Sequence, residues 1–493
     1  MEISSLDVEA TVHAGAPWVL SRDLPDPVGW ADFGYSPDLT ANLINERRSR
    51  GVIVSAAHAF PLPKGLAPTN RWLASVDALD ELAYRVITGR LAQNVDSALG
   101  GEVLSYRLLS GGPGWTVRDF RYGVSARRNR LRDAMANSGF GGLGTLDVKD
   151  YYPSIQLEPL RSVLDGIGVT SAVADPLIEI LRSWQSEWDV RGVPVGPESS
   201  GLLGNIMLIS VDKIVADACD PFTRVTDDYL MSIGSNEFPP LVEAVTRELA
   251  RLSLELNESK VRHFVTRDDA GLRLFDREIE DLVIALRDDG DRGVERVREA
   301  FETEARAELP NESRLRWCLK VLCNRGDPFA LRLVEESPTI ARIDPKGFGA
   351  YFSRLVGDKK IDLDWLVSLA VQDATPGSAA IQLQALLACS KARISKALAV
   401  PLEEVALHSG DWVPLRCAYV EAWAASEAGK LGHAVEAAIA VGTPQHRRAL
   451  ILSVRRWRPS TKRTAGLTKL RAVAPEALPA IEWISDGCPR LAA

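Results

Sequence analysis

The C-terminal half of the chain shows a helical pattern of hydrophobic and polar positions. From about residue 268 onward, Ala and Leu recur three and four residues apart, and short loops with Pro, Gly or Asp interrupt the pattern. Helices are expected to begin near Ser313, Pro345, Gly377, Asp411 and Thr443. Their spacing of about 33 residues is typical of stacked helix hairpins. The pattern therefore predicts an all-α, HEAT-like helical-repeat domain over residues 268–493.

The N-terminal half has a mixed pattern. Residues 145–266 alternate short apolar strands with amphipathic helices, and residues 77–98 have the spacing of one long helix. Residues 1–55 contain several Pro and Gly, which favours an irregular leader with one short helix near residues 36–49. The predicted fold class is α+β.

Composition excludes several classes of protein. The chain has 493 residues, 46% of them hydrophobic and 25% charged, with a net charge of −8. A protein that grips a long duplex is usually more basic. The six cysteines include no CxxC pair, which favours free thiols in a reducing cytoplasm. Neither a signal peptide nor an apolar run of membrane-spanning length is seen, so we expect a cytoplasmic protein without a membrane partner.

Three aspartates occur where metal ligands would be needed. Asp147 ends an apolar strand, and Asp227 and Asp228 lie between two short strand-forming segments, residues 225–226 and 229–231. Three carboxylates on adjacent strands can hold two Mg²⁺ ions, with Mn²⁺ as a substitute. One ion activates an attacking hydroxyl and the other neutralises the pyrophosphate that leaves. Aspartates are also common in solvated turns, but adjacent like charges repel unless a cation lies between them.

Other residues suit the handling of a nucleotide. Tyr152 follows Asp147 closely, and its ring could block a 2′-hydroxyl. Gly196 lies in a Gly/Pro-rich turn that lets the backbone approach a ligand. Lys64 and Arg71 could bind phosphates, and Lys260 could protonate pyrophosphate. Each residue alone also fits a structural role, as a core aromatic, a loop glycine or an exposed cation.

Taken in order, these segments resemble the palm of a reverse transcriptase, and the resemblance extends over residues 55–266. Asp147 matches the metal-binding Asp of the first palm motif, and Tyr152 its aromatic steric gate. Asp227 and Asp228 match the metal-binding pair. Lys260 ends a Leu-Asn-x-x-Lys element like the one that follows this pair in the family.

The fingers of the family are matched as well. Lys64 and Arg71 stand where the fingers bind the nucleoside triphosphate, and residues 105–107 (Ser-Tyr-Arg) resemble a fingers segment of bacterial members. Residues 192–205, with Gly196, resemble the palm motif that precedes the aspartate pair. The resemblance implies a leader (1–55), fingers (56–144), a palm with the polymerase active site (145–267) and the helical domain (268–493).

The chain departs from the common reverse-transcriptase motifs at several positions, and these departures indicate which members of the family it resembles most. Val195 replaces the usual Gln, Val225 replaces a common aromatic, and helices replace a recognisable thumb or RNase H region. These features are most similar to bacterial defence-associated reverse transcriptases of the abortive-infection type, similar to AbiK. The resemblance implies protein-primed, template-independent synthesis from dNTPs, a covalently attached single-stranded DNA product, homo-oligomers and antiphage defence.

Two alternatives stay open. One is DNA synthesis templated by a bound noncoding RNA, and the other is a non-catalytic defence scaffold whose repeats bind a partner. Two basic stretches bear on the first alternative: Arg118–Arg132 holds six arginines, and Arg447–Arg471 holds nine Lys or Arg and no acid. Each stretch is either a solvated helix face or a channel for a single strand.

Protein priming needs a hydroxyl that reaches the site. The chain has nine tyrosines, and Tyr35 lies between Gly34 and Pro37 in a segment expected to be a mobile loop. Tyr35 is therefore the candidate primer, with a serine or threonine as the alternative.

Overall fold

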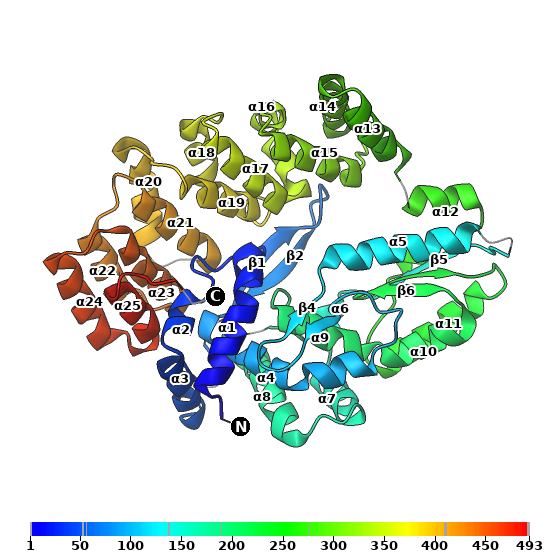
Figure 1. Cartoon of the computed structure of the whole chain (residues 1–493), viewed down its shortest axis with the longest axis horizontal. Coiled ribbons are helices and arrows are strands. Elements are labelled where there is room, and N and C mark those ends of the chain that lie inside the picture. Colours follow the sequence, from blue (N-terminus) through cyan, green and yellow to red (C-terminus); the bar gives the residue numbers. More distant parts are fainter. Residues whose placement is uncertain are drawn as a thin grey trace.

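The computed structural model describes residues 2–51, 54–55, 57–136, 139–188, 190–274, 276–408 and 412–490. It has an α+β fold in which helices dominate and the strands form small antiparallel sheets. Figure 1 shows a broken ring. The four-stranded sheet and its helices lie on one side, an arc of helices continues from them, and the last helices reach the N-terminal ones.

The four-stranded sheet positions the predicted site. Its order is β6 (Phe222–Val225), β7 (Asp228–Ser232), β5 (Leu143–Asp147) and β8 (Arg262–Phe264), with antiparallel neighbours. All five residues of β5 are buried, in keeping with its central place.

Helices cover both faces of this sheet. Tyr229 and Met231 point to the side where α10 (Ile209–Ala218) and α11 (Phe238–Arg251) complete a hydrophobic cluster. Leu230, one position out of phase, packs on the other side against Leu131 of α5.

The helices between the strands follow the sequence pattern in part. Residues 77–98 form α4 (Ala78–Ala98), capped by the Asp77 side chain, as predicted. After Gly196 the chain forms two helices, α9 (Glu198–Met207) and α10, with an angle of 52° between them. The other elements of this part are β1 (His58–Pro63), β2 (Asn70–Ser75), β3 (Leu108–Ser110), β4 (Thr116–Val117), α5 (Phe120–Ala136), α6 (Tyr151–Ser154), α7 (Leu157–Gly166) and α8 (Ser171–Trp188).

Of the helices described, none is by itself long and apolar enough to cross a membrane, whereas α9 and α10 together meet that length and composition across their bend.

The N-terminal segment is more regular than expected. The prediction of a largely irregular leader is wrong, because α1 (Ser5–Ser21), α2 (Ala31–Tyr35) and α3 (Pro37–Ser49) cover most of it. A capping box in which Ser4 and Asp7 exchange hydrogen bonds starts α1. Val8 and Val12 of α1 then pack in a common cluster with residues of α4.

The C-terminal helices, α12 to α25, are here called the helical array. Its helix starts confirm the predicted spacing, since helices begin at Glu312, Pro345, Ala379, Val413 and Pro444. Asp411 itself lies outside the described residues. The bounds are α12 (Arg267–Leu274), α13 (Arg277–Asp288), α14 (Asp291–Ala305), α15 (Glu312–Arg325), α16 (Phe329–Glu336), α17 (Pro345–Gly357), α18 (Leu363–Ala370), α19 (Ala379–Cys389), α20 (Lys396–Leu407), α21 (Val413–Ala425), α22 (Leu431–Ala440), α23 (Pro444–Ser453), α24 (Thr461–Val473) and α25 (Leu478–Ser485).

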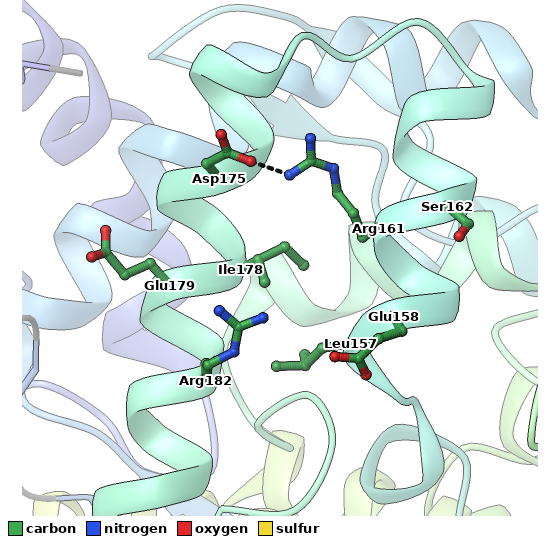
Figure 2. Close-up of a pocket in the computed structure, with 8 residues that line it drawn as sticks. All are labelled: Leu157, Glu158, Arg161, Ser162, Asp175, Ile178, Glu179 and Arg182. Carbon is green, nitrogen blue, oxygen red and sulfur yellow. Dashed lines mark hydrogen bonds and ion pairs between the residues drawn. The ribbon is translucent and has the colours of Figure 1, made fainter.

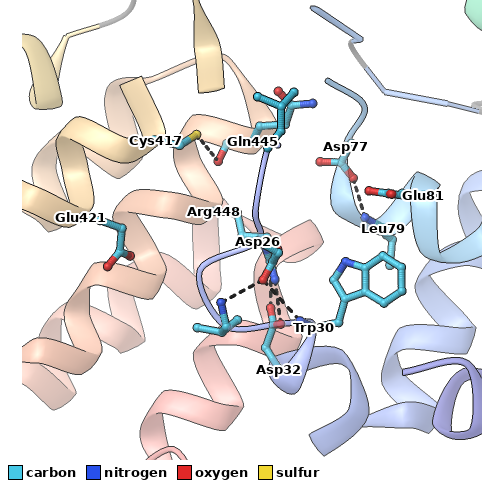
Figure 3. Close-up of polar contacts among 12 residues, drawn as sticks. Asp26, Trp30, Asp32, Asp77, Leu79, Glu81, Cys417, Glu421, Gln445 and Arg448 are labelled. Carbon is cyan, nitrogen blue, oxygen red and sulfur yellow. Dashed lines mark hydrogen bonds and ion pairs between the residues drawn. The ribbon is translucent and has the colours of Figure 1, made fainter. Parts of the chain in front are cut away.

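A buried ion cluster joins the end of the array to the N-terminal segment. Arg448 on α23 donates to Asp26 at 2.6 Å and to Asp32 at 2.8 Å, and both carboxylates are almost fully buried (Figure 3). Burial of a charge is costly unless it is paired. The cluster therefore ties together two segments that are far apart in the sequence.

Candidate active site

Three aspartates meet at one corner of the four-stranded sheet. Asp147, the last residue of β5, is the cross-strand partner of Asp228, the first residue of β7. Cross-strand partners extend from the same face of a sheet. Asp227 lies in the turn between β6 and β7, next to Thr226, whose φ is +60°. The Thr226 N–H donates to the Ser105 hydroxyl at 2.7 Å, which holds the turn.

Asp227 has a pKa well above the ordinary value of an aspartate. Burial raises its pKa to about 6, and the neighbouring charges of Asp147 and Asp228 contribute to the rise. Lys260 opposes it. A partly buried group of like charges is stabilised by any cation that comes among them.

Two residues of the Leu-Asn-x-x-Lys element bind Asp147. Lys260 Nζ lies 2.7 Å from Asp147 Oδ2, and Asn257 Nδ2 lies 2.9 Å from Oδ1. The Asn257 N–H also donates to the Asp147 carbonyl oxygen at 2.8 Å, and Thr145 Oγ1 donates to the Lys260 carbonyl oxygen at 2.9 Å. This element is thus fixed beside the β5 end of the cluster.

Arg127 is a site residue that the sequence did not single out. It comes from α5, and its guanidinium donates to Asp228 Oδ2 at 3.0 Å and to the Asp228 carbonyl oxygen at 3.2 Å. The available signal was the run of arginines on one helix, which does not say which of them faces the sheet. The neighbour of Leu131 one turn earlier does so, because Leu131 packs under the same face.

The residues present fit a divalent cation by their chemistry. Carboxylate oxygens are the ligands Mg²⁺ prefers, and a cation would relieve the repulsion from Asp147 and Asp228 that, after burial, contributes to the raised pKa of Asp227. In the described part of the chain, however, no group of three or more His, Cys, Asp or Glu side chains is arranged to hold a metal. The carboxylates of Asp147 and Asp228 are bound instead by Lys260 and Arg127. A metal would have to exchange with these partners.

Tyr152 lies beside the aspartates. Burial raises the pKa of its hydroxyl well above the ordinary value, with contributions from Tyr106, Tyr151 and Asp227, while a hydrogen bond with Thr226 opposes the rise. The structure thus places this ring next to the β6–β7 turn.

Glycines of residues 192–205, a loop that continues into α9, fit closely around Tyr152. A Cβ on Gly192, whose φ is +60°, would stand 2.2 Å from the Tyr152 carbonyl oxygen. A Cβ on Gly204 would stand 2.9 Å from the Tyr152 ring. Both distances are shorter than a Cβ can tolerate, so glycine is needed for this close approach.

The same loop is joined to the β1–β2 hairpin. The Ala74 N–H donates to the Val195 carbonyl oxygen at 2.8 Å, and Gly196 follows with φ of +132°. Arg71 stands earlier on the same strand, opposite Leu62. The predicted nucleotide loop and the predicted phosphate-binding strand are therefore neighbours.

Lys64 and Arg71 are exposed cations near the site. Lys64 Nζ lies 3.7 Å from Asp150 Oδ1. The pKa of Tyr106 is raised by burial and by Glu198, and the charge of Arg71 opposes this rise. Arg71 is thus close enough to act on Tyr106, which lies next to Tyr152.

Tyr35 is not brought to the aspartates. It is the last residue of α2, a helix, where a mobile loop was expected. Its hydroxyl donates to Asp486, which raises its pKa, and Figure 1 shows α2 beside α25, on the far side from β5 and β6. A priming role for Tyr35 stays a prediction, and it would require this contact to open.

In the second basic stretch, Arg447–Arg471, several arginines form ion pairs with acidic residues of the same chain. Its ion pairs join Arg447 to Glu476, Arg448 to Asp26 and Asp32, and both Arg455 and Arg456 to Glu421. These contacts favour a structural role for this stretch over a strand-binding channel.

The hollow of about 590 Å³ between α7 and α8 is not part of this site. Arg161 and Asp175 form an ion pair across it, and Arg182 and Glu179 also line it (Figure 2). None of the predicted site residues is among its lining.

Comparison with known proteins gives a distant similarity of fold. No family model matches the chain, and no curated protein matches it. The structure is similar to apo telomerase from Candida tropicalis, with a TM-score of 0.31 and 11% identity over 88% of this chain and 68% of that one. It is also similar to telomerase from the same organism in complex with a TWJ fragment of telomeric RNA, with a TM-score of 0.30 and 10% identity over 93% and 73% of the two chains. Similarity at this level does not identify a chemistry, which has to come from the residues of the site.

Proposed function

We propose that this protein is a nucleotidyltransferase of the reverse-transcriptase type, which joins dNTPs into DNA. The observation that supports this most is the corner where Asp147 and Asp228 are cross-strand partners and Asp227 lies in the adjoining turn. Burial, with the charges of Asp147 and Asp228, raises the pKa of Asp227, and a carboxyl group perturbed in this way supports a functional role for the corner.

The aspartates Asp147, Asp227 and Asp228 would hold two Mg²⁺ ions, or Mn²⁺ in their place, which supply charge stabilisation for the attacking oxygen and for pyrophosphate. Lys260 already lies at this corner, 2.7 Å from Asp147 Oδ2, and is the proton donor to the pyrophosphate that leaves.

The remaining residues bind and select the nucleotide. Lys64 and Arg71 bind the triphosphate as exposed cations on one hairpin. The backbone at Gly196 approaches the nucleotide, because no side chain stands in the way. Tyr152 excludes a 2′-hydroxyl, so that the substrate is a deoxynucleotide.

The biological setting is proposed from the sequence resemblance. The Gly/Pro-rich loop at residues 192–197 and the helical array in the place of a thumb support a cytoplasmic, homo-oligomeric enzyme of antiphage defence. The same resemblance supports protein-primed, template-independent synthesis, with the single-stranded DNA product attached to the chain. Light scattering of the full-length protein tests self-association: a mass above the 53.8 kDa of one chain is expected.

A bound noncoding RNA as template is the alternative that the resemblance keeps open. The absorbance spectrum of the purified protein separates the two. A maximum shifted to 260 nm, removed by ribonuclease, would favour an RNA template, whereas DNase-sensitive material that stays with the protein under denaturing conditions would favour a covalent DNA product.

The proposed chemistry is tested by removing one carboxylate of the pair. Asp227→Ala or Asp228→Ala should lower dNTP incorporation with Mg²⁺ by on the order of a thousandfold, since metal and dipole electrostatics dominate such sites. Asp217→Ala, an exposed aspartate on α10, is the matched control and should keep full activity. Variants that are folded by circular dichroism and fully active would remove the basis of the proposal.

A further inference from the structure

The β1–β2 hairpin, which carries Lys64 and Arg71, packs on the helical array. Phe60 of β1 is 1% exposed and belongs to the same hydrophobic cluster as the core of the array. The Phe60 ring lies edge-on to Trp412, with centroids 6.2 Å apart, and the Trp72 ring stacks on Trp412 at the same distance. The fingers predicted from the sequence are therefore built partly on the array.

The tip of the hairpin is held by a carboxylate from α15. The Leu66 N–H donates to Glu312 Oε1 at 2.9 Å, and Arg316 pairs with Glu312 Oε2 at 2.7 Å. Gly65 is buried beneath this contact with φ of +72°, and a Cβ there would stand 2.1 Å from Glu312 Oε1. The close approach of backbone and carboxylate thus depends on glycine.

A second contact fixes the other side of the tip. Arg342 donates to the Ala67 carbonyl oxygen at 2.8 Å and to the Gly377 carbonyl oxygen at 3.0 Å, so it joins the tip to two segments of the array. At the base of the hairpin, Gln445 Nε2 donates to the Ser75 carbonyl oxygen at 3.0 Å. The array therefore contacts the hairpin at its tip, middle and base.

The hairpin also contacts the side of the aspartates. These contacts include the Ala74 to Val195 backbone hydrogen bond, the packing of Ala74 against the cluster that holds Leu146 and Tyr229, and the 3.7 Å approach of Lys64 to Asp150. Lys64 and Arg71 stay exposed between the two sides. A loop gains a defined position only from contacts that outweigh its conformational entropy, and here most of them come from the array.

We infer that the helical array is a structural part of the nucleotide site, with Glu312 and Arg342 as positioning residues for the β1–β2 hairpin. Through the tip loop, residues 64–69, they set where Lys64 and Arg71 lie relative to the aspartates. The inference rests on the proposed function in one respect, that Lys64 and Arg71 bind the triphosphate. The array is then a support of the site and not an appended module.

Three variants of the full-length chain test this inference. Glu312→Ala removes the acceptor of the Leu66 N–H, Glu312→Gln keeps a carbonyl acceptor, and Glu335→Ala removes an exposed carboxylate on α16 as the matched control. Amide hydrogen exchange of the peptide covering residues 64–69 measures how firmly the tip of the hairpin is fixed on the array. A fluorescent N-methylanthraniloyl-dATP reports on nucleotide affinity.

Glu312→Ala should exchange these amides about tenfold faster and bind the nucleotide at least about fivefold more weakly. In incorporation assays its KM should rise by a similar factor while kcat stays within about twofold, because the aspartates are untouched. Glu312→Gln should restore most of each property, and Glu335→Ala should match the wild type.

If the amides of residues 64–69 exchange at the wild-type rate in Glu312→Ala, Glu312 does not fix the tip of the hairpin. Faster exchange with unchanged nucleotide affinity would overturn the positioning role. A wild-type protein that neither binds the fluorescent nucleotide nor incorporates dNTPs would overturn the proposed function, and with it the nucleotide role of the hairpin. Amide exchange separates a failure of the proposed function from a failure of the inference, because it detects the contact between Glu312 and the hairpin tip without any nucleotide.

Discussion

At the candidate site, acidic and basic side chains lie close together and form ion pairs. Asp147, Asp227 and Asp228 share one corner, and the cations of Lys260 and Arg127 are the partners that this fold supplies for two of them. Coulomb energies between partly buried charges reach several kcal/mol at such distances, so small changes of partner have large effects.

Substitution of Tyr152 tests how the site selects deoxynucleotides over ribonucleotides. Tyr152→Ala should raise the ratio of rNTP to dNTP incorporation by at least about tenfold, because a pocket that loses a ring no longer rejects one hydroxyl. Tyr152→Phe keeps the ring and should keep the wild-type ratio. Equal ratios in the wild type and Tyr152→Ala would assign the ring to packing alone.

Asp80 gives a prediction for pH. Burial and the charge of Asp77 raise its pKa to about 7, against the opposing effect of Arg47. In the unfolded chain Asp80 ionises near pH 4, so the free energy of unfolding falls as pH rises from 4 to 7 and is level for this group above 7. Its contribution is about 4 kcal/mol at most, because the pKa rises by about three and each unit of pKa corresponds to about 1.4 kcal/mol.

Denaturant unfolding of the wild type and Asp80→Asn between pH 4.5 and 8 measures this effect. The variant should lack the decline seen in the wild type over that range. Parallel curves for the two proteins would show that Asp80 ionises normally in the folded chain.

The sequence pointed to the aspartate corner because the order of motifs restricts which residues can meet on a sheet. Asp147 and the pair Asp227-Asp228 were expected at one site from the order of the motifs and the family resemblance, and the structure brings them together. Arg127 could not be picked out, because several arginines of α5 share the same local signal. Which one faces the sheet depends on the tertiary packing of Leu131.

At the scale of elements, α6 and the segment formed by residues 192–197 and α9 fit against each other through glycines. Gly192→Ala should destabilise the protein by about 1–3 kcal/mol, since it combines a positive φ with a contact of 2.2 Å to the Tyr152 carbonyl oxygen. Thermal unfolding measures the loss. Gly166→Ala, where a Cβ would meet nothing within 4 Å, should leave the midpoint unchanged or slightly higher. Equal midpoints for both variants would show that the loop yields to the added Cβ.

Helices with strong periodicity were predicted well, and those with mixed patterns were not. α4 and the starts of α15, α17 and α19 agree with the sequence within two residues. In α1 the prediction of an irregular segment failed, because Gly15 and Pro17 hid a helix that begins at the Ser4–Asp7 capping box and is completed by packing on α4. Tertiary contacts override such local signals.

For the whole molecule, contacts between segments far apart in the sequence decide the architecture. No local pattern in the sequence shows that Phe60 is buried in the core of the array. The same holds for Trp72 and Trp412, which stack across the junction. The domain boundaries drawn from the sequence stay predictions, and this shared core shows how closely the segments on either side cooperate.

Substitution of Arg448 tests the contact between the end of the helical array and the N-terminal segment. Arg448→Met should destabilise the protein by about 3–5 kcal/mol, because it leaves Asp26 and Asp32 buried without their cation. Adding Asp26→Asn and Asp32→Asn should recover part of the loss. Arg458→Met, at an exposed position of the array, is the matched control and should have little effect. Thermal midpoints that fall equally in both single variants would argue against a role for the buried cluster.

The most direct measurement of the central claim is incorporation of labelled dATP by the purified full-length protein, with and without Mg²⁺. The wild type and Asp217→Asn should incorporate label in a reaction that EDTA stops, and Asp147→Asn should lose at least on the order of a hundredfold of the rate while staying folded. Incorporation by Asp147→Asn at the wild-type rate, or by the wild type in excess EDTA, would contradict the assignment of nucleotidyl transfer to this corner of the sheet.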